Sequence, residues 1–488
     1  DMPRISKLLA AAAACLMLSA CTSFSPATDD LMRPPRLTPE QRAINDALDD
    51  AALTQNYSLK YPKSGDHRSA FVFHDIDGDG EEEAIVFYEP SIDNTARIVL
   101  LDRQDGVWRS LCDLPGAGQD VEFVAFANIT AKDASDVVVG WSGSDREEKQ
   151  LRVYRYSPAD RVLVNALAEG VSPGYTTYLI DDLDRNGQAD VFLLSSNSRT
   201  TLESFWINLL SFDGDAVAIV DKKPLTERIL QFAGVTAGRL SAGSARRAIF
   251  VDELVPGDSL AVGSTDILVT EVFSVADGEL VPVISYSEEG EGEEADYDRL
   301  DPDYQKPSLY QMTKRPNTAS GANNPNSVPS PLCTDIDGDR AIEIPTARLL
   351  PGYDQVDEAD RLYLTEYNRL EKDELVRVFA AAINRGGGYM VEFPQQWIGA
   401  VTIVNQMENG EWRFIGYNGS DDPLNDLSVE LARIRVVSQK DYQDKFLENY
   451  QKFSESRGMF SYYGYIPESP SSPLAITWTD LQDMFSLL

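Results

Sequence analysis

The chain has 488 residues, of which 43% are hydrophobic and 25% are charged, a composition typical of a soluble globular protein with two or three domains. Its formal net charge of −36 disfavours nucleic acid and anionic membrane surfaces as partners, because binding either one requires a basic surface. The composition therefore favours a protein that binds cations or neutral ligands, with no nucleic-acid partner.

The N-terminal residues have the pattern of a bacterial export signal. Arg4 and Lys7 precede an apolar run that is too short to span a membrane permanently, and the run leads into Leu-Ser-Ala-Cys at residues 18–21. This tetrad resembles the lipobox of bacterial lipoproteins. The resemblance implies a signal peptide at residues 1–20, a lipid anchor on Cys21, and a location at the extracytoplasmic face of the bacterial cell membrane. The alternative is an ordinary secretory signal with a chance cysteine.

Residues 21–55 are predicted to form a polar tether followed by a helix. Thr38 suits the N-cap, Pro39 the first helical position, and Gln41 the third, which together make a capping box. The apolar positions that follow are Ile44, Leu48 and Leu53. We expect this helix to pack on the first blade-like repeat or between domains.

Short β-like runs separated by turn residues follow from residue 56 to about residue 350. The runs are AIVFYEP, ARIVLLDR, VEFVAFANI, VVVGW, LRVYRY, TTYLIDDL, VFLLSS, SFWINLLSF, AIFVDE and DILVTEVFSV. Their spacing predicts an all-β sandwich, barrel or propeller.

An acidic loop lies between two of the first runs. Asp residues stand at its positions 1, 3 and 5, glycine at position 6, and glutamate at position 9; these are Asp75, Asp77, Asp79, Gly80 and Glu83. A hard cation such as calcium needs an oxygen cage of this kind.

The same loop pattern recurs along the chain. Two copies keep oxygen-bearing side chains at positions 1, 3, 5 and 9, namely Asp182, Asp184, Asn186 and Asp190, and then Asp335, Asp337, Asp339 and Glu343. Two others keep few ligands, with Asn128 and Asp136, and with Arg239 and Arg247, at positions 1 and 9. The period of roughly fifty residues, with several strands per repeat, is the signature of propeller blades.

These repeats resemble the FG-GAP/VCBS family. The resemblance implies a β-propeller of about five to seven blades over residues 56–360, calcium as the bound ion, and a backbone carbonyl ligand at position 7, which is Glu81, Gln188 or Ala341. Arg340 replaces the glycine at position 6 of the last acidic copy. The alternative is a metal-free acidic turn. An EF-hand does not fit, because strands flank the loops and the twelfth positions are Val86 and Leu193 in the first two acidic copies.

Residues 286–331 interrupt the repeats with an acidic tract and a polar, proline-bearing loop. We expect a disordered insertion here. The alternatives are a calcium-collecting or partner-binding tract, or an additional blade without the motif.

Residues 361–488 are predicted to form a C-terminal α+β domain. The spacing of Tyr442, Phe446, Tyr450 and Phe453 predicts a helix after Ser438. A capping box at residues 479–482 predicts a second helix that carries Met484 and Phe485. The entry G-Y-x-x-x-x-P-x-x-W at residues 388–397 is similar to the start of the PsbP-like fold.

No residue is predicted to be catalytic or to bind an organic cofactor. The only histidines are His67 and His74, and neither a nucleophile elbow nor a phosphate-binding glycine loop occurs in the sequence. After the signal and anchor cysteines, Cys112 and Cys333 remain, either paired or as two thiols.

Together these features predict a mainly β protein, lipid-anchored at the cell surface, that binds a glycan or a surface protein on a calcium-stabilised propeller. The alternatives are a polysaccharide-processing enzyme and a structural cell-envelope factor.

Overall fold

The computed structural model describes residues 37–52, 56–143, 149–197, 204–226, 229–257, 266–286, 307–317, 331–357, 360–438, 440, 447–468 and 472–488. The predicted signal peptide, Cys21 and most of the tether lie outside these residues. The chain divides into two compact units. The first contains the described residues up to Tyr61, Ser69–Asp75 and Asp79–Gly116. The second contains Pro62–Arg68, Ile76–Gly78 and the described residues from Ala117 onward. Among the described residues, no helix is long and apolar enough to cross a membrane.

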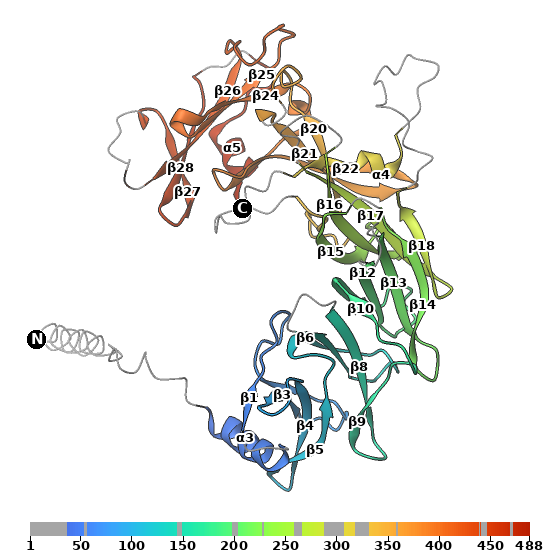
Figure 1. Ribbon diagram of the computed structural model, residues 1–488. Helices are drawn as coiled ribbons and strands as arrows, with labels where there is room; N and C mark the ends of the chain where they lie inside the picture. Colours follow the sequence, from blue (N-terminus) through green and yellow to red (C-terminus); the bar gives the residue numbers. More distant parts are fainter. Residues whose placement is uncertain are drawn as a thin grey trace, which may run out of the picture. The chain divides into compact units, whose positions relative to one another are not determined.

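The first unit contains one sheet and the predicted N-terminal helix (Figure 1). The sheet has the order β1-β3-β4-β5, with β2 paired to β3; the strands are Tyr57–Leu59 (β1), Phe71–His74 (β2), Glu83–Pro90 (β3), Arg97–Gln104 (β4) and Val107–Pro115 (β5). Helix α3, Pro39–Ala51, starts at Thr38 with the predicted capping box. Ile44 and Leu48 are fully buried in the core that α3 shares with this sheet, so the helix packs on the first strands.

The second and third sheets are also antiparallel. The second has the order β10-β8-β7-β6, with β9 paired to β8; its strands are Asp120–Ala127 (β6), Asp136–Ser142 (β7), Lys149–Ser157 (β8), Val162–Asn165 (β9) and Gly174–Tyr175 (β10). The third has the order β11-β12-β13-β14; its strands are Thr177–Asp181 (β11), Asp190–Asn197 (β12), Ser204–Phe212 (β13) and Val217–Pro224 (β14). One apolar core contains side chains from both sheets, including Val138, Val191 and Leu210.

The fourth sheet has the order β15-β16-β17-β18, with β19 paired to β17. Its strands are Gln231–Arg239 (β15), Arg247–Val255 (β16), Ile267–Ala276 (β17), Glu279–Ile284 (β18) and Arg315–Pro316 (β19). All ten runs that the sequence predicts as strands are strands in these four sheets.

Part of the predicted disordered insertion is ordered, so that expectation was wrong for residues 307–317. Helix α4, Leu309–Met312, starts with a capping box, and Arg315 of β19 is buried, with its guanidinium 2.8 Å from the Asp252 carboxylate. The ion pair joins this segment to β16, and strand pairing joins it to β17. The remainder of the insertion, apart from Tyr286 and Pro331, lies outside the described residues.

The last two sheets share one core. The fifth has the order β20-β21-β22-β23-β29, with strands Ile344–Leu349 (β20), Tyr363–Glu371 (β21), Glu374–Asn384 (β22), Tyr389–Glu392 (β23) and Phe485–Leu487 (β29). The sixth has the order β24-β25-β26-β28-β27, with strands Val401–Gln406 (β24), Glu411–Gly416 (β25), Glu430–Ser438 (β26), Gln451–Arg457 (β27) and Phe460–Tyr465 (β28). Two short 3₁₀ turns, Gln395–Trp397 (η4) and Met407–Asn409 (η5), and helix α5, Trp478–Met484, complete this part. Its core extends from Leu350 to Phe485 and includes Trp397 and Phe414.

Two helix predictions in this part need correction. Phe453 lies in strand β27, where it is the buried residue of an exposed edge strand, because β27 pairs with β28. Tyr442 and Phe446 lie outside the described residues. Helix α5 begins two residues earlier than predicted, at the Thr477 N-cap, and Phe485 belongs to β29.

Candidate metal centre: the repeated acidic loops

The five repeated loops occupy equivalent places in the sheets. Four of them join paired strands, β2 to β3, β6 to β7, β11 to β12, and β15 to β16. The fifth is closed by a bridge between Thr334 and Glu343 immediately before β20. Residues 75–83, 182–190 and 335–343 are called the acidic loops below, and residues 128–136 and 239–247 the ligand-poor loops.

The first carboxylate of each acidic loop accepts the backbone N–H of position 6. The three pairs are Gly80 to Asp75 at 3.1 Å, Gly187 to Asp182 at 2.9 Å, and Arg340 to Asp335 at 3.0 Å. The N–H of position 7 likewise donates to the position 5 side chain. These pairs are Glu81 to Asp79 at 2.8 Å, Gln188 to Asn186 at 2.7 Å, and Ala341 to Asp339 at 2.7 Å. The position 1 and position 5 side chains thus accept the same two backbone N–H groups in all three loops.

The turn requires a left-handed backbone at position 6. Gly80 and Gly187 have φ of +91° and +93°, and Arg340 adopts +71°. The missing glycine therefore does not change the turn of the third acidic loop, although Arg340 carries a Cβ in a conformation that costs L-residues about 1–2 kcal/mol.

The third acidic loop brings its carboxylates together. Oxygens of Asp335, Asp337 and Asp339 lie within 4.8 Å of one another. Glu343 at position 9 is fully buried; its Oε2 accepts the N–H of Ile336 at 2.9 Å, whereas its Oε1 has no hydrogen-bond partner among the described residues. Burial, followed by the three neighbouring aspartates, raises the pKa of Glu343 to about 7. A buried oxygen without a donor, beside three carboxylates, fits a calcium ligand set.

One cationic side chain already contacts this loop. The Arg369 guanidinium in β21 lies 2.9 Å from the Asp339 carboxylate, and it also contacts Glu371. A fixed positive charge at position 5 competes with a metal cation for that oxygen.

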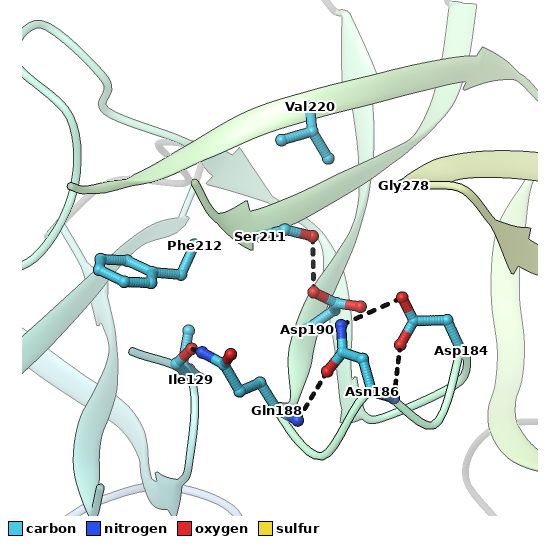
Figure 2. Close-up of a pocket in the computed structure, with 9 residues that line it drawn as sticks. All are labelled: Ile129, Asp184, Asn186, Gln188, Asp190, Ser211, Phe212, Val220 and Gly278. Atoms are coloured by element: carbon cyan, nitrogen blue, oxygen red, sulfur yellow. Dashed lines mark hydrogen bonds between the residues drawn. The ribbon is translucent and has the colours of Figure 1, made fainter. Parts of the chain in front are cut away.

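The second acidic loop lines a pocket of about 310 Å³ (Figure 2). Four of its five predicted ligands face this space, namely Asp184, Asn186, Gln188 and Asp190, together with Ile129, Ser211, Phe212, Val220 and Gly278. Ser211 donates to Asp190 at 2.5 Å. Burial, and then Asp184 and Asp182, raise the pKa of Asp190 to about 6.

The first acidic loop differs in where its residues are grouped. Asp75, Asp79, Glu81 and Glu83 belong to the first unit, and Glu83 is buried at the start of β3. Asp77 lies in Ile76–Gly78, which groups with the second unit.

The ligand-poor loops satisfy their ninth positions with protein groups. Asp136 accepts the N–H groups of Ile129 and Thr130 and the Thr130 hydroxyl, at 2.9, 2.6 and 2.9 Å. Arg247 forms an ion pair with Asp181 at 2.7 Å. These contacts explain how both loops fold without a ligand set.

A buried pair of glutamates lies elsewhere in the fourth sheet. Glu271 accepts the N–H groups of Thr226 and Tyr286, at 3.0 and 2.9 Å, whereas Glu253 is fully buried and accepts none among the described residues. Burial and the neighbouring Glu271 raise the pKa of Glu253 well above its usual range. A raised pKa favours the neutral form of a buried carboxyl group beside a second one.

The two histidines and the two remaining cysteines that the sequence singled out lie within the strands or pack against them. His67 packs edge-on against Phe126, with ring centroids 5.3 Å apart, and His74 ends strand β2. Cys112 and Cys333, both among the described residues, are not disulfide-bonded, and the Cys333 thiol donates to Asp252 at 3.2 Å.

Sequence reasoning missed Ser211, Phe212 and Arg369. Each comes from a strand distant in sequence from the loop that it contacts or faces. Register alone brings Ser211 beside Asp190, since the neighbouring residues Leu210 and Val191 are paired. A serine or arginine in a strand carries no local signal of such a contact.

No protein-family model matches the chain, and no curated protein matches it. Among solved structures, the chain is similar to a Bacteroides fragilis protein described as a "putative 6-phosphogluconolactonase". The identity is 9% and the TM-score 0.25, over 74% of this chain and 90% of that one. A likeness of this degree carries no argument about fold or activity.

Proposed function

We propose that the protein is a lipid-anchored cell-surface binding protein, built on a β-propeller that calcium stabilises, with a glycan or a surface protein as its ligand. The observation that carries the calcium part is Glu343, whose buried Oε1 has no hydrogen-bond partner among the described residues and lies beside three aspartates.

In each acidic loop, the side chains at positions 1, 3, 5 and 9 and the carbonyl at position 7 would hold the ion. Calcium would supply positive charge that neutralises the crowded carboxylates and so stabilises the turn. The residues themselves preorganise the turn, since Asp182 and Asp335 each accept the N–H of position 6.

The pocket at the second acidic loop supports a glycan as the ligand. Its volume of about 310 Å³ is at the small end of ligand sites, which suits one or two sugar units. Oxygen-bearing side chains line one part, and Ile129, Phe212 and Val220 line another. This combination matches a sugar, which has both hydroxyl groups and apolar C–H surfaces.

The test compares glycan-array binding and pulldown by the full chain, in detergent, with calcium and with EDTA. Calcium-dependent binding of a glycan or of a defined surface protein is the expected result. Turnover of a polysaccharide would identify the chain as an enzyme, and copurification of membrane proteins without glycan binding would identify an envelope factor; either result would contradict the proposal.

A further inference from the structure

Each ligand-poor loop contacts the acidic loop that follows it in sequence. Residues 128–136 contact the loop 182–190, and residues 239–247 contact the loop 335–343. In both pairs the position 1 residue makes contacts through its side chain and through its own carbonyl, which accepts the position 8 N–H. The side chain donates to the position 6 carbonyl in the first pair and to the position 5 carbonyl in the second.

In the first pair, three hydrogen bonds join the loops. The Asn128 amide donates to the Gly187 carbonyl at 2.7 Å, and the Ala189 N–H donates to the Asn128 carbonyl at 2.9 Å. The Gln188 side chain donates to the Ile129 carbonyl at 2.8 Å. Positions 6, 7 and 8 of the acidic loop are therefore each hydrogen-bonded to the ligand-poor loop.

The second pair shares two of these features, although its side-chain contact is at position 5. The Arg239 guanidinium donates to the Asp339 carbonyl at 2.6 Å, and the Ile342 N–H donates to the Arg239 carbonyl at 2.9 Å. Arg239 also forms a parallel bridge with Ala341. A side chain at position 1 again reaches a carbonyl of the next loop, and a position 8 N–H again donates to the position 1 carbonyl.

The position 8 hydrogen bond orients a predicted metal ligand. The N–H of Ala189 and the carbonyl of Gln188 belong to one peptide, as do the N–H of Ile342 and the carbonyl of Ala341. In a planar trans peptide the N–H and C=O groups point in opposite directions. Anchoring the N–H on the ligand-poor loop therefore fixes the direction of the position 7 carbonyl.

We propose that the ligand-poor loops are positioning elements. The main-chain carbonyls of Asn128 and Arg239 fix the position 7 carbonyl of the next acidic loop, and their side chains hold that loop in place through the Gly187 and Asp339 carbonyls. The inference rests on the proposed calcium binding. Asn128 and Arg239 stand at position 1, where the acidic loops have a carboxylate, and their side chains donate to the next loop. Each ligand-poor loop therefore supports the cation site of the next loop in place of one of its own.

The ligand-poor loops are suited to this role because they need no cation. Asp136 is satisfied by Thr130 and Ile129, and Arg247 by Asp181. Their own folds are therefore in place before calcium arrives, which reduces the cost of ordering the ligand carbonyl on binding.

The experiment uses two full-length parents, each with one acidic loop of the second unit left intact. Asp77→Ala with Asp337→Ala leaves residues 182–190, and Asp77→Ala with Asp184→Ala leaves residues 335–343. Calcium affinity is measured by titration calorimetry after Asn128→Ala or Arg239→Met is added to each parent. Circular dichroism in EDTA checks that every variant is folded.

The expected result is a crossover. Asn128→Ala weakens calcium binding about three- to tenfold in the first parent, the range expected for one lost hydrogen bond, and leaves the second parent unchanged. Arg239→Met has the reverse effect, and Arg239→Lys, which keeps a donor, restores part of the affinity. A merely structural role would lower stability in EDTA without this crossover.

Unchanged affinities, or equal losses in both parents, overturn the positioning role while the proposed calcium binding stands. If neither parent binds calcium, the proposed function fails and the positioning role fails with it.

Discussion

Single residues determine how well each acidic loop is built. Arg340 adopts the left-handed backbone that glycine provides in the other two acidic loops. Its side chain is exposed, so little packing is lost when it is removed.

We expect Arg340→Gly to raise the free energy of unfolding by about 1 kcal/mol, because it removes backbone strain. Chemical denaturation in EDTA measures the change. Arg109→Gly in β5, where the backbone is extended, is the matched control and should destabilise the protein. A loss of stability in Arg340→Gly would contradict the role assigned to strain.

Arg369 has an opposite influence on the same loop, because its guanidinium contacts Asp339. Arg369→Met should raise the calcium affinity of residues 335–343 by about two- to fivefold, the range expected for releasing a partly exposed ion pair. Calorimetry in the parent that keeps only this loop gives the value. An unchanged or weaker affinity would show that the guanidinium does not compete with the ion.

At the scale of elements, the buried Glu253–Glu271 pair in β16 and β17 predicts a pH dependence of stability. The pKa of Glu253 is raised in the folded state, so the unfolded chain ionises first as the pH rises above about 4.5. The stability that comes from the bound proton is complete below that pH and decreases as the pH rises toward the folded pKa.

Glu253→Gln should remove this decrease, because glutamine stays neutral at every pH. The variant should gain stability over the native protein between pH 5 and 8, by at most about 1.4 kcal/mol per pH unit. Thermal unfolding across that range tests it, with the exposed Glu279→Gln in β18 as the control. Parallel curves for the native protein and Glu253→Gln would contradict the assignment.

The strands and acidic loops were predictable because their signals are local. β-branched and aromatic runs of five to ten residues became strands, and fixed spacing within nine residues located the predicted ligands in one turn. The Asn128–Gly187 contact spans 59 residues, so no local pattern reveals it.

Local signals also misled where tertiary pairing prevailed. The aromatic spacing before Phe453 matches a helix, yet Phe453 lies in β27, Gln451–Arg457, which pairs with β28. At the C-terminus, Thr477 with Asp480 and Thr479 with Gln482 both have capping-box spacing. The structure uses the first pair, since Thr477 accepts the N–H of Asp480 at 3.2 Å.

At the scale of the whole molecule, the proposed lipid anchor makes a separate prediction. Cys21→Ala should move the protein from the membrane fraction to the soluble fraction, because the thiol that would carry the lipid is absent. Growth with a labelled fatty acid followed by cell fractionation measures both the location of the protein and its lipid content. Label incorporated equally into the variant would contradict anchoring at Cys21.

Calcium binding is the central claim, and thermal unfolding of the full chain in about 10 mM calcium and in EDTA tests it most directly. A site with a dissociation constant of about 0.1 mM would then gain about 2.7 kcal/mol, so the account predicts a midpoint several degrees higher in calcium. Asp77→Ala combined with Asp184→Ala should remove most of that difference. The same midpoint in calcium and in EDTA for the native chain would contradict the account.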